Sequence, residues 1–381
     1  MTKVKYYSLS KILHIGVPIG AQYYVVMSER SDGKTYACKS LGLNGFKDNE
    51  IEIKGYIQNG SQFAIVRRWD YDFKGKRGAT LFDDLVAQNK ISEWTNGQWT
   101  DVYFYSHRWY LSKFDEKLNK RVLDVEPFAF AFAISQMEHD KSSSYPKIDK
   151  IIFDEFLTRG QYLPDEFILF TNVISTIVRD RNDVKIFMIG NTVNQYSPYF
   201  DEMGLTNVRK QQQGTIDVYN YGESDLHVCV EYSDTALKRK KASDVYFAFD
   251  NPKLKMITQG AWEMAIYPHC PIKYRPKNIK YTYFIVFGGD TLQCEIVKSE
   301  KNIFTFIHRK TTPIKDTERD LIYCAEHSPR PNYKRKITKP TNNLEKLIYS
   351  FFIKEKVFYQ SNVIGEVVRN YLLWCESDKI M

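Results

Sequence analysis

The sequence lacks any apolar run of about 20 residues, the length that a transmembrane helix requires. Its opening residues, MTKVKYYSLSK, also lack the apolar stretch of a signal peptide. Internal repeats and low-complexity tracts are missing too, which argues against a solenoid or a disordered tail. We therefore expect a soluble intracellular protein with no membrane partner.

Paired cysteines are also missing. The six cysteines are spread through the chain, and no two of them form a CxxC motif. In a long chain without a signal peptide, this spacing predicts reduced thiols and argues against disulfides or a zinc site.

Acidic residues are scarce in the last third of the chain. The 381 residues include 54 Lys and Arg against 46 Asp and Glu, a net charge of +8. From Lys238 to the end, 26 basic residues stand against 15 acidic ones, so this part carries +11 and the preceding 237 residues carry −3. A local basic excess is typical of proteins that bind a polyanion, nucleic acid above all. A solvated basic face without function fits the charge equally well.

Strand-like and helix-like segments alternate over the first 200 residues. Apolar runs such as Tyr23–Met27 and KIDKIIFDEF alternate with amphipathic stretches such as LPDEFILFTNVISTIVRDRN. Strands separated by helices imply a parallel sheet with crossover connections, and thus an α/β fold. We expect this domain to span residues 1–212, a linker region containing one or two strands to span 213–243, and a basic domain to span 244–381.

The stretch SERSDGKT follows the first predicted strand and opens a helix-like segment. In a phosphate-binding loop (Walker A), backbone N–H groups surround a phosphate, the lysine reaches the β- and γ-phosphates, and the hydroxyl holds Mg²⁺. A surface turn at a helix N-terminus is the alternative, because the usual first glycine is replaced here by serine. We predict that ATP is bound by Ser28, Glu29, Arg30, Ser31, Asp32, Gly33, Lys34 and Thr35.

The strand KIIFDEF ends in two acids, Asp154 and Glu155. A carboxylate at a strand end beside a phosphate-binding loop can hold Mg²⁺ (Walker B), so Thr35 and Asp154 are the predicted metal-binding residues. The following glutamate can orient and deprotonate the attacking water. An ordinary surface acid pair is the alternative. The order of the two motifs is that of P-loop ATPases with an added catalytic glutamate, the ASCE type, and it favours ATP hydrolysis.

Two further groups complete the predicted catalytic set. Asn191 ends the buried strand VKIFMIGN, where such ATPases carry a polar residue that senses the γ-phosphate. Ring ATPases also take a cation, the arginine finger, from the neighbouring subunit. Arg181 and Arg179 are the first candidates, ahead of Lys141 and Arg159, and a solvated surface charge is the simpler interpretation of each.

Together, SERSDGKT, IIFDEF and IFMIGNT resemble the DNA-packaging ATPases of φ29-like phages, which are terminase-type motors. The stretch FAIVRR is similar to the second strand of that group. The recognisable similarity covers about residues 20–200. It implies that Lys34 and Thr35 bind phosphate and Mg²⁺, and that Asp154 holds Mg²⁺. It also implies that Glu155 is the catalytic base and that Asn191 couples hydrolysis to movement.

The resemblance also implies a set of partners. A homomeric ring, a pentamer in these phages, would sit on the portal of a procapsid and use ATP to drive double-stranded viral DNA inward. The place of action would be the host bacterial cytoplasm, with a transient stay on the procapsid. A structural packaging RNA is a further implied partner.

Beyond residue 243 only the layout matches that group. The run YTYFIVFGGDTLQCEIVKSEKNIFTFIHRK predicts three consecutive antiparallel strands, and two helical segments follow. We expect a small RNase H-like α+β domain, as in large terminases. A two-metal nuclease site needs at least three carboxylates, and no such acidic cluster is present in the sequence of this region. We therefore expect that nuclease activity is absent.

A packaging motor should contact DNA phosphates rather than bases, because it must ignore sequence. The candidates are Arg67, Arg68, Lys74, Lys76, Arg77, Lys238, Arg239, Lys240 and Lys241. A solvated loop is the alternative for each. Two other functions remain open on the sequence alone. They are a helicase or replication ATPase, and a nucleic-acid-binding scaffold that hydrolyses nothing.

Overall fold

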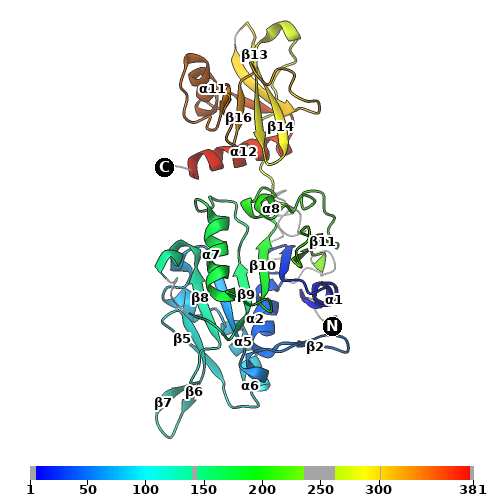
Figure 1. The fold of residues 1–381 in the computed structure, drawn as a ribbon. Helices are drawn as coiled ribbons and strands as arrows, with labels where there is room; N and C mark the ends of the chain where they lie inside the picture. Colours follow the sequence, from blue (N-terminus) through cyan, green and yellow to red (C-terminus); the bar gives the residue numbers. More distant parts are fainter. Residues whose placement is uncertain (1–5, 140–143, 236–261, 301, 378–381) are drawn as a thin grey trace, which may run out of the picture. The chain divides into compact units, whose positions relative to one another are not determined.

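The computed structural model describes residues 6–139, 144–235, 262–300 and 302–377 of the chain. The fold divides into two compact units, which we describe separately (Figure 1). The first unit comprises Met1–Thr158 and Asp165–Trp262, and the second comprises Arg159–Pro164 and Glu263–Met381. The second unit therefore contains a short segment from the middle of the chain, Arg159–Pro164. The predicted boundaries placed this segment in the first domain, residues 1–212.

One mixed sheet of ten described strands forms the centre of the first unit. From edge to edge it contains β11 (Ile216–Asn220), β12 (His227–Tyr232), β1 (Tyr23–Ser28), β10 (Lys185–Asn191), β9 (Ile148–Asp154), β4 (Gln62–Arg67), β8 (Ala129–Ala133), β6 (Arg108–Asp115) and β5 (Asp101–Tyr105), and β7 (Lys120–Leu123) pairs with β6. The strands from β12 to β8 are parallel. The expected α/β fold with a parallel sheet is confirmed for this central part, and antiparallel strands extend the sheet at both edges.

Strands β11 and β12 lie within residues 213–243, the range expected to be a linker. In the structure they belong to the large sheet, because β12 pairs with β1 and β11 pairs with β12. Five of the six residues of β12 are buried, and four of these five are Val, Cys or Tyr, which explains why this stretch joins the core. The remaining residues of the expected linker, 236–243, lie outside the described residues.

Eight described helices surround this sheet in the first unit. They are α1 (Ser10–Gly16), α2 (Lys34–Asn44), α3 (Tyr56–Asn59), α4 (Lys76–Ala79), α5 (Asp83–Ala87), α6 (Lys90–Trp94), α7 (Glu166–Val178) and α8 (Pro198–Glu202), with 3-10 turns η1 (Asp70–Asp72) and η2 (Ile134–His139) and a short hairpin of β2 (Phe46–Lys47) and β3 (Glu52–Ile53). None of the helices in the described part of the chain is both long and apolar enough to cross a membrane.

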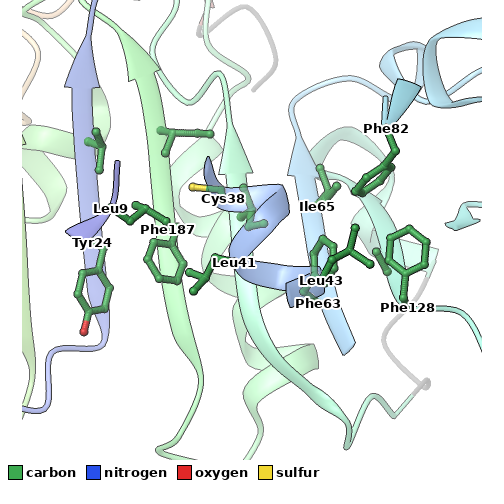
Figure 2. Close-up of a cluster of buried hydrophobic side chains, with 14 of the residues drawn as sticks. Leu9, Tyr24, Cys38, Leu41, Leu43, Phe63, Ile65, Phe82, Phe128 and Phe187 are labelled. Atoms are coloured by element: carbon green, nitrogen blue, oxygen red, sulfur yellow. The ribbon is translucent and has the colours of Figure 1, made fainter. Parts of the chain in front are cut away.

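Helices α2 and α7 cover opposite faces of the central strands. Neighbouring residues of a strand point to opposite faces, and on β9 Ile152 belongs to the core cluster under α2, whereas Phe153 stacks against Phe170 of α7 with ring centroids 4.7 Å apart. Figure 2 shows Cys38 and Leu41 of α2 among the side chains that rise from the sheet. Because both faces are covered, the central strands are buried along almost their whole length.

An aromatic cluster extends this core toward β8 and β6. The Phe82 ring lies 5.0 Å from Phe128, 5.5 Å from Trp109 and 6.3 Å from Phe63, centroid to centroid, in edge-to-face geometry. Figure 2 shows Phe82 and Phe128 on the side of Phe63 away from α2. All four side chains are fully buried, so this cluster holds the inserted hairpin strands to the parallel core.

The second unit contains a six-stranded mixed sheet of its own. Its order is β17 (Tyr333–Lys334), β16 (Ile322–Cys324), β13 (Ile279–Phe287), β14 (Asp290–Lys298), β15 (Ile303–Arg309) and β18 (Val357–Tyr359). Strands β13, β14 and β15 are consecutive and antiparallel, as predicted from their alternating sequence. The 3-10 turn η3 (Pro276–Asn278) precedes β13, and α11 (Asn343–Ile353) and α12 (Asn362–Ser377) follow the strands. The buried Tyr371 of α12 packs against Phe287 at 5.8 Å.

Replacing Phe82 by alanine should lower the free energy of unfolding of the first unit by about 3–5 kcal/mol, because it leaves a cavity between three aromatic rings. Urea denaturation followed by tryptophan fluorescence measures this change, since Trp109 is one of those rings. The matched control is Phe114→Ala, which removes a ring that is 60% exposed. That variant should change the stability by less than about 0.5 kcal/mol. Equal stabilities of the two variants would contradict the assignment of Phe82 to the core.

Candidate active site

The predicted motifs meet at one edge of the large sheet because β1, β10 and β9 are parallel neighbours. Ser28, the last residue of β1, is in register with Asn191, the last residue of β10, and Ile189 is in register with Asp154 of β9. The carboxyl ends of parallel strands lie at the same edge, so the three predicted motifs converge although more than 150 residues separate the first from the last.

The loop from Ser28 to Lys34 depends on glycine at one position. Gly33 has φ 100°, in the left-handed region, immediately before α2 begins at Lys34. A Cβ atom there would lie 3.3 Å from Tyr6 and would also be strained by the backbone angle. Ser31 adopts φ 57°, and the backbone oxygen of Asp32 accepts a hydrogen bond from Tyr7 N–H at 2.9 Å. The turn is therefore fixed by its own backbone and by the N-terminal segment.

Lys34 lies inside this loop and connects two of the motifs. Its Nζ donates to Ser28 Oγ at 2.7 Å, to the carbonyl oxygen of Glu29 at 2.8 Å and to Asn191 Oδ1 at 3.2 Å. Burial lowers the pKa of the Lys34 ammonium group to about 8. A cation kept away from water in this way is suited to bind an anion such as a phosphate. Ser28, the departure from the usual glycine, thus serves as a hydrogen-bond acceptor for Lys34.

Asp154 accepts hydrogen bonds on both carboxylate oxygens. Thr35 Oγ1 donates to Oδ1 at 3.1 Å, and Arg67 Nη2 contacts Oδ2 at 2.6 Å. A hydroxyl and a carboxylate oxygen this close are a fitting ligand pair for Mg²⁺, which binds through one or two protein oxygens and keeps most of its waters. Within the described residues, no group of three or more His, Cys, Asp or Glu side chains forms a larger metal site.

Glu155 differs from its neighbour in exposure and in backbone conformation. The Asp154 side chain is buried, whereas Glu155 is exposed at the edge of the sheet. Its φ of 61° lies in the left-handed region, which is uncommon for a residue with a side chain. The Glu155 N–H donates to the carbonyl oxygen of Ile189 at 3.0 Å. Such strain often marks a functional position, and here it directs a carboxylate to the solvent side of the site.

The remaining residues of the predicted loop surround Lys34. Glu29 and Asp32 are buried, and Arg30 and Ser31 are exposed at the tip of the turn. The eight predicted ATP-binding residues are therefore consecutive: Ser28 ends β1, residues 29–33 form the turn, and Lys34 and Thr35 begin α2.

Arg179 and Arg181 lie far from the site within this chain. They follow the C-terminal end of α7, a helix about 20 Å long, and precede β10, whose opposite end carries Asn191. Arg181 donates to the carbonyl oxygens of Ile177 and Pro146 at 2.9 and 3.0 Å.

Arg159, the lower-ranked finger candidate, belongs to the second unit. Its Nη2 contacts Glu366 Oε1 at 2.6 Å, so it is engaged in an ion pair there. Lys141, the other lower-ranked candidate, lies outside the described residues.

The predicted DNA-contacting residues fall into three groups. Arg67 contacts Asp154 at 2.6 Å, and Arg68 is buried with Glu166 at 2.7 Å, so both side chains are engaged by acids of the protein. A sequence shows charge but not burial, and the contact of Arg67 and Arg68 with DNA stays a prediction. Lys74, Lys76 and Arg77 lie on an exposed stretch beside Trp69 and Tyr71, whose rings stack 6.1 Å apart. The run Lys238, Arg239, Lys240 and Lys241 lies outside the described residues.

Sequence reasoning missed Glu166 and Tyr199. Glu166 accepts from Arg68 and from the Tyr199 hydroxyl at 2.8 Å, and both are fully buried. In the sequence, Glu166 belongs to LPDEFILFTNVISTIVRDRN, a stretch whose pattern predicts only an amphipathic helix. Glu166 is recognised only through its contact with Arg68, which depends on the pairing of β4 with β9. A local sequence pattern does not reveal which strands pair.

The fold and the site define a mixed α/β protein in which a lysine-bearing loop and an acidic strand end meet at one edge of a largely parallel sheet. The chain belongs to the family described as Podovirus DNA encapsidation protein (Gp16), whose model matches residues 1–372. The predicted kinship with the packaging proteins of φ29-like phages is thereby confirmed.

Two relatives show the extent of the similarity. The chain is 24% identical over 268 residues to the DNA packaging protein of Bacillus phage B103. The aligned residues cover 69% of this chain and 71% of that protein. It is also 24% identical over 271 residues to the DNA packaging protein of Bacillus phage phi29. Here the aligned residues cover 70% of this chain and 69% of that protein.

Two solved structures share the fold. The Phi-28 gp11 DNA packaging motor has a TM-score of 0.53 at 15% identity and covers 99% of both chains. The bacteriophage Phi-29 viral genome packaging motor assembly has a TM-score of 0.54 at 20% identity and covers 97% of this chain and 99% of that one. The likeness of fold therefore includes both units.

The lowered pKa of Lys34 predicts how nucleotide binding depends on pH. A bound phosphate favours the charged ammonium, so the pKa of Lys34 must be higher in the complex than its value of about 8 in the free protein. The affinity for a fluorescent ATP analogue should be constant below about pH 8 and should then fall by up to about tenfold per pH unit. The γ-phosphate itself is already ionised in this range.

The control for this titration is Lys34→Arg, whose guanidinium stays charged over the same range. It should bind the analogue more weakly but without the loss above pH 8. A wild-type affinity that stays constant to pH 9.5, at the same salt concentration, would contradict the role of Lys34.

Proposed function

We propose that this protein is the ATP-driven motor that moves double-stranded viral DNA through the portal into a preformed procapsid. The observation that carries the proposal is the convergence of Lys34, Thr35, Asp154 and Glu155 at one sheet edge in a member of the DNA encapsidation family. The strand order supports an ASCE-type P-loop core, because the additional strand β10 lies between β1, which precedes the loop, and the acidic strand β9.

Each site residue has a separate role in the proposed hydrolysis. Lys34 binds the β- and γ-phosphates of ATP, and the backbone of the loop from Ser28 to Gly33 surrounds them. Thr35 and Asp154 hold Mg²⁺, which neutralises charge on the phosphates when it is bound. Glu155, exposed beside them, orients the attacking water and accepts its proton.

Asn191 couples hydrolysis to movement in this proposal. Its Oδ1 accepts from Lys34 Nζ at 3.2 Å, and it ends the strand that lies between the other two motifs. Loss of the γ-phosphate on hydrolysis would move Lys34 away from Asn191. Because Asn191 is the last residue of β10, the loss of this hydrogen bond would act directly on that strand.

The position of Arg179 and Arg181, at the end of α7 remote from the site, supports a ring in which one of them acts on the neighbouring subunit. A homopentamer is the arrangement implied by the resemblance. The proposed partners are the portal and procapsid, viral DNA and a structural packaging RNA, and the proposed place of action is the host bacterial cytoplasm.

DNA phosphates are proposed to bind the exposed stretch that contains Lys74, Lys76 and Arg77. Lys74 and Arg77 contact Asp70 and Asp72 at 2.7 and 3.7 Å, and both lysine and arginine side chains are more than 60% exposed. Exposed ion pairs of this kind are weak, so a phosphate can replace the carboxylate at little cost. The residues Lys238 to Lys241 remain candidates on their charge alone.

The second unit is proposed to be an RNase H-like domain without nuclease activity. Its strand order supports the fold, since β14 and β15 follow β13 on one side and the parallel strands β16 and β17 lie on the other. Strand β14 carries two acids, Asp290 at its first position and Glu295 further along. Asp290 pairs with Arg309 at 2.9 Å, and Glu295 accepts from Tyr274 and Gln293 at 2.6 and 2.8 Å. A carboxylate held by neighbouring donors is poorly suited to bind a catalytic metal.

Replacing Glu155 by glutamine should abolish ATP turnover, by about 100-fold or more, because an amide cannot accept the proton of the attacking water. Binding of an ATP analogue should remain, since Lys34 and Thr35 are unchanged. Steady-state phosphate release and fluorescence titration measure the two quantities. Glu126→Gln is the matched control, because it removes an exposed carboxylate that pairs with Lys147. Normal turnover by the Glu155 variant would refute the assignment of the base.

The full-length protein should leave supercoiled plasmid DNA intact in the presence of Mg²⁺ or Mn²⁺. The physical reason is that a two-metal cut requires several carboxylates around one point. Agarose electrophoresis detects nicked and linear products. Metal-dependent nicking that co-purifies with the protein and disappears with EDTA would contradict the loss of nuclease activity.

A further inference from the structure

Arg68 has no part in the hydrolysis just described, although it touches the loop that carries Glu155. Strands β4 and β9 are parallel neighbours, with Val66 in register with Phe153. The residues that follow, Arg68 and Glu155, therefore leave the sheet side by side. Arg68 is only 7% exposed, so its charge has to be satisfied by groups of the protein.

Arg68 donates to two separate stretches of the chain. Its Nε donates to Glu166 Oε2 at 2.7 Å, its Nη2 to the carbonyl oxygen of Phe156 at 2.9 Å, and its Nη1 approaches that of Glu155 at 3.4 Å. The second carboxylate oxygen of Glu166 accepts from the Tyr199 hydroxyl at 2.8 Å. A planar guanidinium can serve such divergent acceptors at once, whereas a lysine ammonium on a flexible stem acts as a single point charge.

The backbone of Glu155 is held from both sides. Its N–H donates to the carbonyl oxygen of Ile189 on β10, and its own carbonyl faces Arg68 at the end of β4. These contacts hold Glu155 at φ 61°, a conformation that a residue with a side chain seldom adopts unless its surroundings impose it. In extended backbone, the carboxylate of Glu155 would point elsewhere.

A short excursion of the chain separates Phe156 from Glu166. The chain leaves the first unit after Thr158 and returns at Asp165, and Arg159–Pro164 belong to the second unit. Within that unit, Arg159 pairs with Glu366 at 2.6 Å, and Arg369 donates to the carbonyl oxygen of Arg159 at 2.6 Å. Arg68 contacts Phe156 just before this excursion and Glu166 just after it.

We propose that Arg68 is a positioning residue for Glu155. It bridges the two ends of the excursion and holds the left-handed backbone of Glu155, so that the carboxylate stays aligned with the attacking water. The inference rests on the proposed role of Glu155 as general base. Lys34 and Thr35 have contacts that do not involve Arg68, so nucleotide affinity should not depend on it.

The test uses the full-length chain with Arg68→Lys, which keeps the charge opposite Glu166 but cannot reach the backbone carbonyls as well. We expect kcat for ATP to fall roughly 100-fold, the usual effect of a small misplacement of a catalytic group. The Kd for a fluorescent ATP analogue and the thermal midpoint of unfolding should stay close to those of wild type. The matched control is Arg121→Lys, an arginine paired with Asp101 at 2.6 Å on the hairpin strands, which should keep the wild-type kcat.

A second variant separates positioning from general support. In Arg68→Ala, millimolar guanidinium should restore part of the lost kcat, because it can occupy the space of the missing group and donate to the same acceptors. Urea, which has a similar shape but no charge, should restore none.

Three outcomes would overturn the inference: wild-type kcat in Arg68→Lys, a loss of nucleotide affinity as large as the loss of kcat, or equal effects of guanidinium and urea on Arg68→Ala. Absence of ATP turnover in the wild-type protein, or normal turnover in Glu155→Gln, would instead refute the proposed function itself.

Discussion

The parallel pairing of β1, β10 and β9 is the constraint on which the site depends. Each strand contributes one polar group at its carboxyl end, and the in-register pairing places Ser28 opposite Asn191 and Asp154 one strand further. The hydrogen bonds of Lys34 and Thr35 then join the three strand ends into one cluster. A one-residue shift in any of these pairings would turn the polar group to the other face and separate the cluster.

Three basic side chains lie at the same edge of the sheet, and acidic side chains of the protein neutralise only part of their charge. Lys34, Arg67 and Arg68 lie within a few residues of strand ends and are mostly shielded from water. Arg68 has Glu166 as a buried counter-ion, and removing one partner of such a pair usually costs more than the pair contributes. In the described part of the chain, the hydrogen bonds of Lys34 go to three neutral oxygens, and burial lowers the pKa of its ammonium group. In the proposed function, Arg68 therefore supports the structure, whereas Lys34 binds the phosphates of the nucleotide.

The sequence predicted the features that a local pattern carries. The apolar runs of β9 and β10, the amphipathic α7 and the antiparallel strands β13 to β15 are all found in the structure. The residues Lys34, Thr35 and Asp154 do lie together, because their motifs follow strands that turned out to be neighbours. Arg68 and Glu166 could not be paired in advance, since their contact depends on β4 lying beside β9. Strand order across a sheet is set by packing between distant segments. For the same reason, residues 216–232 were interpreted as strands but were assigned to a linker.

The chain passes between the two units three times. The passages lie between Thr158 and Arg159, between Pro164 and Asp165, and between Trp262 and Glu263. A protein built in this way does not separate into its parts at a single peptide bond. A truncated chain that ended before Glu263 would retain the six-residue excursion but lose Glu366 and Arg369, the partners of Arg159. Domain shuffling by joining two genes end to end could not produce this arrangement either. An exchange of the C-terminal half for that of a relative would preserve these contacts only if the short central segment were exchanged with it.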